Sequence, residues 1–322
     1  MKFPSDDELT DGPNVTPMPI QTDYPEDFRA GFACMVGRPN VGKSTLMNTM
    51  VGSKIAITSD RPQTTRHTIR GIVHHADSQL VLVDTPGFHK PRTLLGKRLN
   101  DVVRETLSQV DVIVVCLAAN EKIGPGDRFI ISEATRARTP LIAAITKTDL
   151  ANSAQIAGAL LEASSLADFE DLVPVSSVRD DQVDILTDEI LTRLPLSPPL
   201  YPNGDITDEP EHVLFAEFVR EAALEGVRQE LPHSLAVEVS ETWREKTSAG
   251  KDLLHVEVTM YVERESQKAI VIGRGGSRLR EVGTRARRQI EALIGEQIFL
   301  RLHVKVAKDW QRDPKYLGRF GF

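Results

Sequence analysis

Short apolar runs alternate with longer amphipathic stretches between residues 31 and 194 of the 322-residue chain. The apolar runs are Phe32–Val36, Gln79–Val83, Val112–Ala118, Leu141–Ile145 and Leu172–Val175. Their continuous apolar character is typical of strands that are buried on both faces. Because helices separate them, the pattern predicts an α/β domain with a mainly parallel sheet. Ile69–His74 is more polar and is expected to form an additional strand near an edge of this sheet.

The pattern changes after a segment that carries five prolines and an Asn-Gly pair between Pro195 and Pro210, a composition that predicts a linker. The elements expected beyond it are a helix at Glu211–Glu230, strands at Ser234–Glu241 and Leu253–Val262, a helix at Ser266–Ile272, a turn at Gly273–Gly276, a helix at Arg278–Ile294 and a strand at Gln297–Val306. Their order, α-β-β-α-turn-α-β, predicts a separate α+β domain.

Composition and charge refine this division. The chain is 40% hydrophobic and 26% charged, as soluble globular proteins are, and its net charge is −7. Residues 262–319 hold 14 Lys/Arg and seven Asp/Glu, a local charge of +7 that leaves −14 for the rest, so this part favours a nucleic-acid partner. Cys34 and Cys116 both lie in apolar runs and are expected to be buried thiols of a reducing compartment.

We therefore divide the chain into an acidic tail (1–30), a nucleotide-binding domain (31–195), a proline-rich linker (196–210) and a second domain (211–322). The tail has no apolar segment of the secretory type and is expected to be disordered. No apolar run approaches the roughly 18 residues that a membrane-spanning helix needs.

The chemistry begins with Gly37-Arg-Pro-Asn-Val-Gly-Lys-Ser44, which matches the phosphate-loop pattern GxxxxGK[ST] between an expected strand and an expected helix at Thr45–Met50. Its glycines let the backbone curl so that amides face phosphates, and the helix N-terminus favours anions. Lys43 is expected to reach the β- and γ-phosphates, and the Ser44 hydroxyl is expected to bind Mg²⁺.

Two further motifs follow apolar strands. Asp84-Thr-Pro-Gly87 places a carboxylate where it can hold the metal's water shell and a glycine whose amide can meet the γ-phosphate. Thr146-Lys-Thr-Asp149 resembles the guanine-reading motif of GTPases, in which Asp149 would accept hydrogen bonds from a donor pair that adenine lacks. Thr146 replaces the usual Asn and so removes an amide expected to tie the base to the phosphate loop.

Four weaker signals also bear on the nucleotide site. Ser176-Ser177-Val178 is expected to offer backbone amides to the guanine, although a simple turn is the alternative. Gln63-Thr-Thr-Arg-His67 is expected to be switch I, with Thr65, or else Thr64, completing the Mg²⁺ shell. Phe88 stands where many regulatory GTPases carry a Gln that orients water, so hydrolysis is expected to be slow or to be assisted. In related GTPases an Asn at the position of Asn40 can bind a potassium ion, so the resemblance to GTPases implies Asn40 as a candidate ligand for an ion that assists hydrolysis.

The motifs GRPNVGKS, PQTTRH, DTPGFHKP and TKTD, in this order, resemble those of the Era family of GTPases. The second domain strengthens the resemblance, because Gly273-Arg-Gly-Gly276 between two helices is similar to the GxxG loop with which KH domains clamp single-stranded RNA. The resemblance spans about Phe32 to Trp310 and implies a P-loop NTPase domain followed by a type II KH domain.

The expected site residues form several sets. The nucleotide set is Gly37, Arg38, Pro39, Asn40, Val41, Gly42, Lys43, Ser44, Thr45, Asp84, Thr85, Pro86, Gly87, Phe88, Thr146, Lys147, Thr148, Asp149, Ser176, Ser177 and Val178. The switch I set is Gln63, Thr64, Thr65, Arg66 and His67. The catalytic set is Lys43, Thr65, Gly87 and Asn40, and the Mg²⁺ ligands are Ser44, Thr65 and Asp84. The RNA-binding set is Gly273, Arg274, Gly275, Gly276, Arg278, Arg280, Arg285 and Arg288, which Lys305, Lys308 and Arg312 extend.

The expected function is hydrolysis of GTP to GDP and phosphate, with Mg²⁺ and with potassium as a candidate cofactor, coupled to RNA binding. The resemblance further implies that the RNA is the 3′ region of 16S ribosomal RNA, that the protein acts in maturation of the small ribosomal subunit, and that it is a cytoplasmic monomer with weak peripheral membrane association. Two alternatives remain: a constitutive RNA-binding protein whose nucleotide site is structural or vestigial, and a membrane-peripheral regulatory GTPase.

Overall fold

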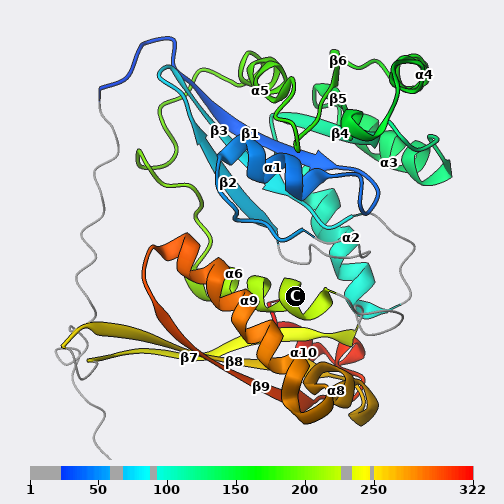
Figure 1. Cartoon of the computed structure of the whole chain (residues 1–322). Coiled ribbons are helices and arrows are strands. Elements are labelled where there is room, and N and C mark those ends of the chain that lie inside the picture. The colour runs from blue at the N-terminus through cyan, green and yellow to red at the C-terminus, as the bar shows by residue number, and fades with distance from the viewer. Residues whose placement is uncertain (1–22, 59–67, 88–92, 226–233, 247–249, 322) are drawn as a thin grey trace, which may run out of the picture.

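The computed structural model describes residues 23–58, 68–87, 93–225, 234–246 and 250–321, which form two sheets with their helices (Figure 1). The first sheet has six strands in the order β2-β3-β1-β4-β5-β6. The strands are β1 (Arg29–Val36), β2 (Ile69–His74), β3 (Ser78–Asp84), β4 (Val112–Ala118), β5 (Leu141–Thr146) and β6 (Asp171–Pro174). All pairs are parallel except β2 with β3, and β2 lies at the edge, as its polar sequence predicts.

Helices cover both faces of this sheet, which explains why its strands are apolar without alternation. The helices are α1 (Lys43–Val51), α2 (Leu94–Leu107), α3 (Pro125–Arg136), α4 (Ser153–Ser164) and α5 (Val183–Leu191). Along β1, Ala33 and Met35 pack with α1 and α5, whereas Cys34 and Val36 pack with α2, α3 and α4. Strand β1 begins at Arg29, two residues before the expected start of the domain, and residues 1–22 lie outside the described part.

The two cysteines pack on opposite faces of the first sheet, and both are free thiols. Burial raises the pKa of Cys116 to about 12 and raises that of Cys34 as well. A thiol that stays protonated is a poor nucleophile, so both act as small apolar residues, as their sequence context predicts.

The proline-rich segment lies along the edge strand β2. Ile72 N donates to Ile206 O at 2.9 Å, and Tyr201 N donates to the Gln79 side chain at 2.9 Å. The linker is thus held by hydrogen bonds to the first sheet before the chain enters its second domain.

The second sheet has three strands, β7 (Ala236–Lys246), β8 (Asp252–Val262) and β9 (Ile298–Val306), in the order β7-β8-β9. The pair β7–β8 is antiparallel and the pair β8–β9 is parallel. Helices α6 (Glu211–Leu224), α8 (Glu265–Ile272) and α9 (Ser277–Ile294) pack on one face of this sheet, and α6 lies between the sheet and the first domain (Figure 1). The expected order α-β-β-α-turn-α-β is confirmed, with a short 3₁₀ turn η2 (Arg274–Gly276) at the glycines.

The C-terminal residues form elements that the sequence pattern did not predict, a 3₁₀ turn η3 (Trp310–Arg312) and a short helix α10 (Pro314–Arg319). Trp310 is fully buried and its indole N–H donates to Ser234 O at 2.8 Å. It shares an apolar cluster with Leu317 and with Leu95 and Leu99 of α2, so this segment joins the second domain to the first domain (Figure 1).

Replacement of Trp310 by Ala is expected to destabilise the second domain by about 3–5 kcal/mol, because it leaves a cavity and removes the indole donor from Ser234 O. Urea unfolding followed by circular dichroism measures the shift. The nearby exposed Arg312→Ala serves as control, with an expected change within about 0.5 kcal/mol. Equal midpoints for the two variants would contradict the structural role of Trp310.

Candidate functional site

The phosphate loop lies at the carboxyl end of β1, between that strand and α1. Its backbone is packed so closely on β4 that a Cβ at Gly37 would lie 2.6 Å from Cys116 O and 2.8 Å from a Val41 methyl. Gly42 adopts φ 102° and Asn40 φ 65°, both in the left-handed region. These conformations let consecutive amides face one concave side, as binding of a polyphosphate requires.

Lys43 begins α1 and folds back over the loop. Its ammonium donates to Gly37 O and Arg38 O, each at 3.1 Å, and the side chain is buried. Burial lowers its pKa, while the neighbouring Asp84 carboxylate partly opposes that effect. A desolvated ammonium at this position can interact strongly with phosphate oxygens.

Ser44 and Asp84 come from different elements and meet beside the loop. The Ser44 hydroxyl donates to Asp84 Oδ2 at 2.6 Å, and Asp84 is fully buried at the end of β3. Two adjacent oxygen donors of this kind suit a hard cation such as Mg²⁺. Next to them, Thr85 Oγ1 donates to Met35 O at 2.9 Å, and a Cβ at Gly87 would lie 3.3 Å from the Pro39 ring. Gly87 thus lies against the phosphate loop.

The expected guanine-binding residues come from two neighbouring loops, after β5 and β6. Ser176 is buried and its hydroxyl donates to Asp149 Oδ1 at 2.8 Å, which leaves the second carboxylate oxygen for another donor. Lys147 adopts φ 58°, and Thr148 N donates to Val175 O at 3.3 Å. Thr49 Oγ1 of α1 donates to Ser177 O at 3.3 Å, whereas the Val178 side chain is exposed.

Thr146 connects this base-binding loop to the phosphate loop. Its buried hydroxyl donates to Val41 O at 2.5 Å and lies 3.2 Å from Leu117 O. The connection that the sequence argument treated as lost with the Asn side chain is therefore made by a hydroxyl. The shorter side chain reaches because β5 ends directly beside the loop.

Arg38 lies within the loop, but its side chain points to α3. The guanidinium donates to Asp127 at 2.7 Å and to Glu121 at 2.9 Å. The hydrogen bond with Asp127 is the main cause of a raised Arg38 pKa. Only the Arg38 backbone is left to face a nucleotide. Asp127 also accepts from Gly124 N at 2.8 Å, and sequence reasoning missed its role in bracing the loop because no motif marks it.

The second candidate site is the glycine turn between α8 and α9. Gly273, Gly275 and Gly276 all have positive φ, between 57° and 74°. A Cβ at Gly273 would lie 2.7 Å from the Arg278 Cβ, so the turn folds tightly onto the start of α9. Arg274 is exposed at its tip. The arrangement presents backbone and a helix N-terminus to solvent, which suits a phosphate-bearing strand.

Comparisons with known proteins match both domains. Residues 32–147 match the family model described as 50S ribosome-binding GTPase, and residues 230–311 match the KH domain. GTPase Era of Streptomyces coelicolor is 61% identical over 301 residues, covering 91% of this chain and 95% of that protein. GTPase Era of Mycobacterium avium is 59% identical, covering 92% and 99%.

This chain belongs to the Era family of GTPases. An Aquifex aeolicus Era variant bound to GDP·AlF4⁻ shares the fold with a TM-score of 0.87 at 35% identity, over 91% of this chain and 99% of that one. Era in complex with MgGDPNP and nucleotides 1506–1542 of 16S ribosomal RNA gives a TM-score of 0.86, with the same identity and coverage. The resemblance inferred from the motifs is confirmed: the protein is a P-loop GTPase with a KH domain.

The structure separates the arginines of this Era-family KH domain into two groups. Arg280 and Arg288 on α9 are exposed. Arg278 and Arg285 instead face α6: Arg278 donates to Glu225 O at 2.7 Å, and Arg285 pairs with the Glu225 carboxylate. The sequence treated the four alike, because charge alone does not show which side of a helix packs.

Some expected site residues lie outside the described part of the chain. They are Gln63, Thr64, Thr65, Arg66 and His67 of the expected switch I, and Phe88 after the DTPG motif.

Replacing Thr146 with Val is expected to weaken binding of both GDP and GTP by about tenfold, because Val41 O loses its buried donor. Thr146→Ser keeps the hydroxyl and should retain near wild-type affinity. Calorimetric titration with GDP, GDPNP and ATP measures the effect, and preference for guanine should persist in both variants because Asp149 is unchanged. Equal affinity in Thr146→Val and wild type would contradict the bracing role.

Proposed function

We propose that this GTPase binds the 3′ region of 16S ribosomal RNA through its KH domain and acts in maturation of the small ribosomal subunit. The observation that carries the proposal is the presence, in one chain, of a braced phosphate loop and a KH glycine turn. Support comes from the fold match to Era bound to 16S nucleotides 1506–1542. We assign the nucleotide site to residues 31–195, the linker to 196–210 and RNA binding to 211–322.

In this proposal the phosphate loop binds GTP through backbone amides, and Lys43 exchanges its two carbonyl partners for phosphate oxygens. Gly87 offers its amide to the γ-phosphate. Asp149, held by Ser176 at 2.8 Å, accepts from the guanine. These groups position the phosphates and stabilise charge as the bond to the leaving GDP breaks, without a covalent intermediate.

Ser44 and Asp84 are the residues that we propose hold Mg²⁺, with Thr65 as the expected switch I ligand. The 2.6 Å contact between Ser44 Oγ and Asp84 Oδ2 brings two oxygen donors together, which fits the ion. When bound, Mg²⁺ neutralises charge on the β- and γ-phosphates.

Asn40 is proposed as the ligand of a potassium ion that assists hydrolysis, since Phe88 cannot orient water by a hydrogen bond. Asn40 adopts φ 65° in the middle of the loop, a conformation that Asn tolerates better than most residues. The side chain therefore adds a polar group where the backbone already curves around the phosphates.

GTP turnover is expected to be faster in potassium than in sodium buffer, to rise with added RNA of 16S nucleotides 1506–1542, and to fall at least about 100-fold in Lys43→Ala. Asn40→Gly is the matched variant, because Gly accepts the same φ while losing the amide. It should turn over equally in the two salts. Phosphate release measures turnover in each of these comparisons. A potassium effect that survives in Asn40→Gly would rule out the ligand role.

The RNA surface is proposed to comprise the glycine turn, Arg274 and the exposed arginines of α9. Arg280→Gln/Arg288→Gln should weaken RNA binding and lower the slope of log Kd against log salt by about 0.7 per lost phosphate contact. Fluorescence anisotropy with the same RNA and GDPNP measures it. Arg128→Gln on α3 is the control, since Arg128 pairs with Glu162 at 2.6 Å in the first domain. An unchanged slope in the double variant would show that the RNA phosphates do not contact this face.

None of the helices in the described part of the chain has the length and apolar character needed to span a bilayer. We propose that the protein acts as a cytoplasmic monomer whose contact with the inner membrane face is peripheral and weak. Flotation with anionic liposomes and light scattering test these two statements.

A further inference from the structure

The segment that leads from α1 toward the expected switch I is docked on the KH domain. Ile57 is only 3% exposed and packs in the apolar cluster of the KH domain with Phe215, Phe218 and Val219 of α6. The Lys54 ammonium lies 5.9 Å from the centre of the Phe218 ring. A residue of the GTPase domain thus completes the core of its neighbour.

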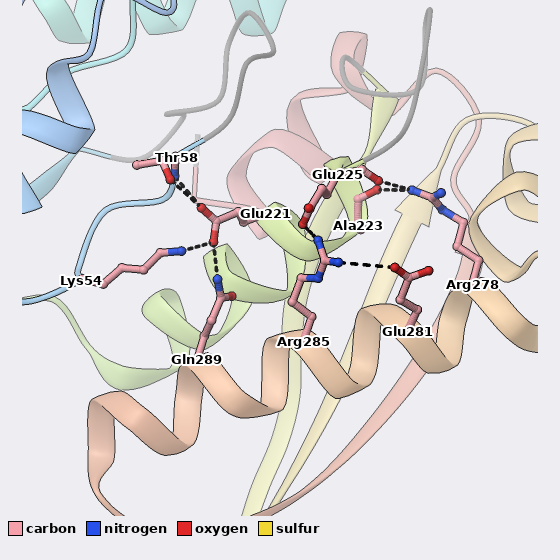
Figure 2. A network of polar contacts seen from close by, with 9 residues as sticks. All are labelled: Lys54, Thr58, Glu221, Ala223, Glu225, Arg278, Glu281, Arg285 and Gln289. Atoms are coloured by element: carbon pink, nitrogen blue, oxygen red, sulfur yellow. Dashed lines mark hydrogen bonds and ion pairs between the residues drawn. The ribbon is translucent and has the colours of Figure 1, made fainter. Parts of the chain in front are cut away.

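One carboxylate holds this segment in place. Glu221 of α6 accepts from Thr58 N at 2.7 Å and from Thr58 Oγ1 at 3.1 Å (Figure 2). Its other oxygen contacts Lys54 Nζ at 2.5 Å and accepts from Gln289 Nε2 of α9 at 2.6 Å. Glu221 is buried, so its charged carboxylate depends on these hydrogen bonds to offset the loss of hydration.

The same helix end also holds the start of the RNA-binding helix. Arg278, two residues after the glycine turn, donates to Ala223 O at 3.1 Å and to Glu225 O at 2.7 Å (Figure 2). Arg285 on the next turns of α9 pairs with the Glu225 carboxylate and lies 3.4 Å from Glu281. The Glu221 carboxylate thus contacts the GTPase segment at Thr58, while backbone carbonyls at the end of the same helix hold Arg278 at the start of α9.

We propose that Glu221 is a positioning residue that couples the nucleotide site to the RNA site. It binds Thr58, directly before residues 59–67, to α6. The same helix end also contacts Arg278 and Gln289 of α9. A nucleotide state that favours one arrangement of Thr58 then favours one arrangement of α6 and α9, and by linkage bound RNA acts back on nucleotide affinity. The inference rests on the proposed function, since it concerns how the GTP and RNA sites communicate.

Glu221→Gln tests the coupling, because the amide has a similar shape but loses the charge and presents N–H groups to the Lys54 and Gln289 donors. The measurement is the Kd of the full chain for RNA of 16S nucleotides 1506–1542, with GDPNP and with GDP. The wild-type ratio of these constants is expected to be on the order of 5–150 in favour of GDPNP. In Glu221→Gln it should approach one, while nucleotide affinity without RNA changes by less than about threefold.

Glu225→Gln is the matched control, since Glu225 lies at the end of the same helix but pairs with Arg285 inside the KH domain. It should keep the wild-type ratio. Thr58→Val removes the hydroxyl that donates to Glu221 from the GTPase side. Combined with Glu221→Gln, it should lower the ratio of the two RNA dissociation constants little further. Thermal unfolding shows that each variant is folded.

The outcomes separate the two levels of the proposal. A ratio in Glu221→Gln equal to that of the wild type, or a wild-type ratio of one, overturns the coupling role of Glu221. Absence of GTP turnover or of RNA binding in the wild type would instead overturn the proposed function.

Discussion

Binding a polyphosphate requires that the backbone itself approach the anion, and the fold around the phosphate loop follows from that constraint. Gly37 has no room for a Cβ because the loop is packed on Cys116 of β4. Thr146 holds Val41 O from the side of the base, and Arg38 is held by Asp127 from the side of α3. The loop is braced by contacts on its outer sides, so its concave side keeps its amides for the ligand.

The KH domain solves a similar problem for a different anion. Its glycine turn is also pressed against a helix start, where Gly273 lies too close to Arg278 to carry a side chain. In both sites the close backbone approach comes from glycine and the favourable field from a helix N-terminus. The basic surface of residues 262–319 adds long-range attraction for RNA that an acidic chain as a whole would not provide.

The two domains meet at the segments of the GTPase domain that border residues 59–67 and 88–92. Ile57 precedes residues 59–67 and packs in the KH core, while Leu95 and Leu99 follow residues 88–92 and pack around Trp310. Contacts of the KH domain therefore lie next to the segment that contains the expected switch I and next to the segment that follows the DTPG motif. The proposed communication between the sites needs no long relay, because one helix, α6, contacts both the GTPase segment and α9.

The sequence by itself determined the elements and the chemistry that depend on neighbours along the chain. Apolar runs without alternation predicted the parallel sheet, and the contiguous motifs at residues 37–44, 84–87, 146–149 and 273–276 predicted the sites, because each ligand is met by a few consecutive residues at a strand end or helix start. Only the tertiary structure decided which distant side chains meet. The hydroxyl of Thr146 on Val41 O, the turn of Arg38 toward Asp127, the split of the α9 arginines and the Glu221 contacts join residues up to 167 positions apart. No local pattern records such pairs, since their geometry is set by how whole helices and sheets pack.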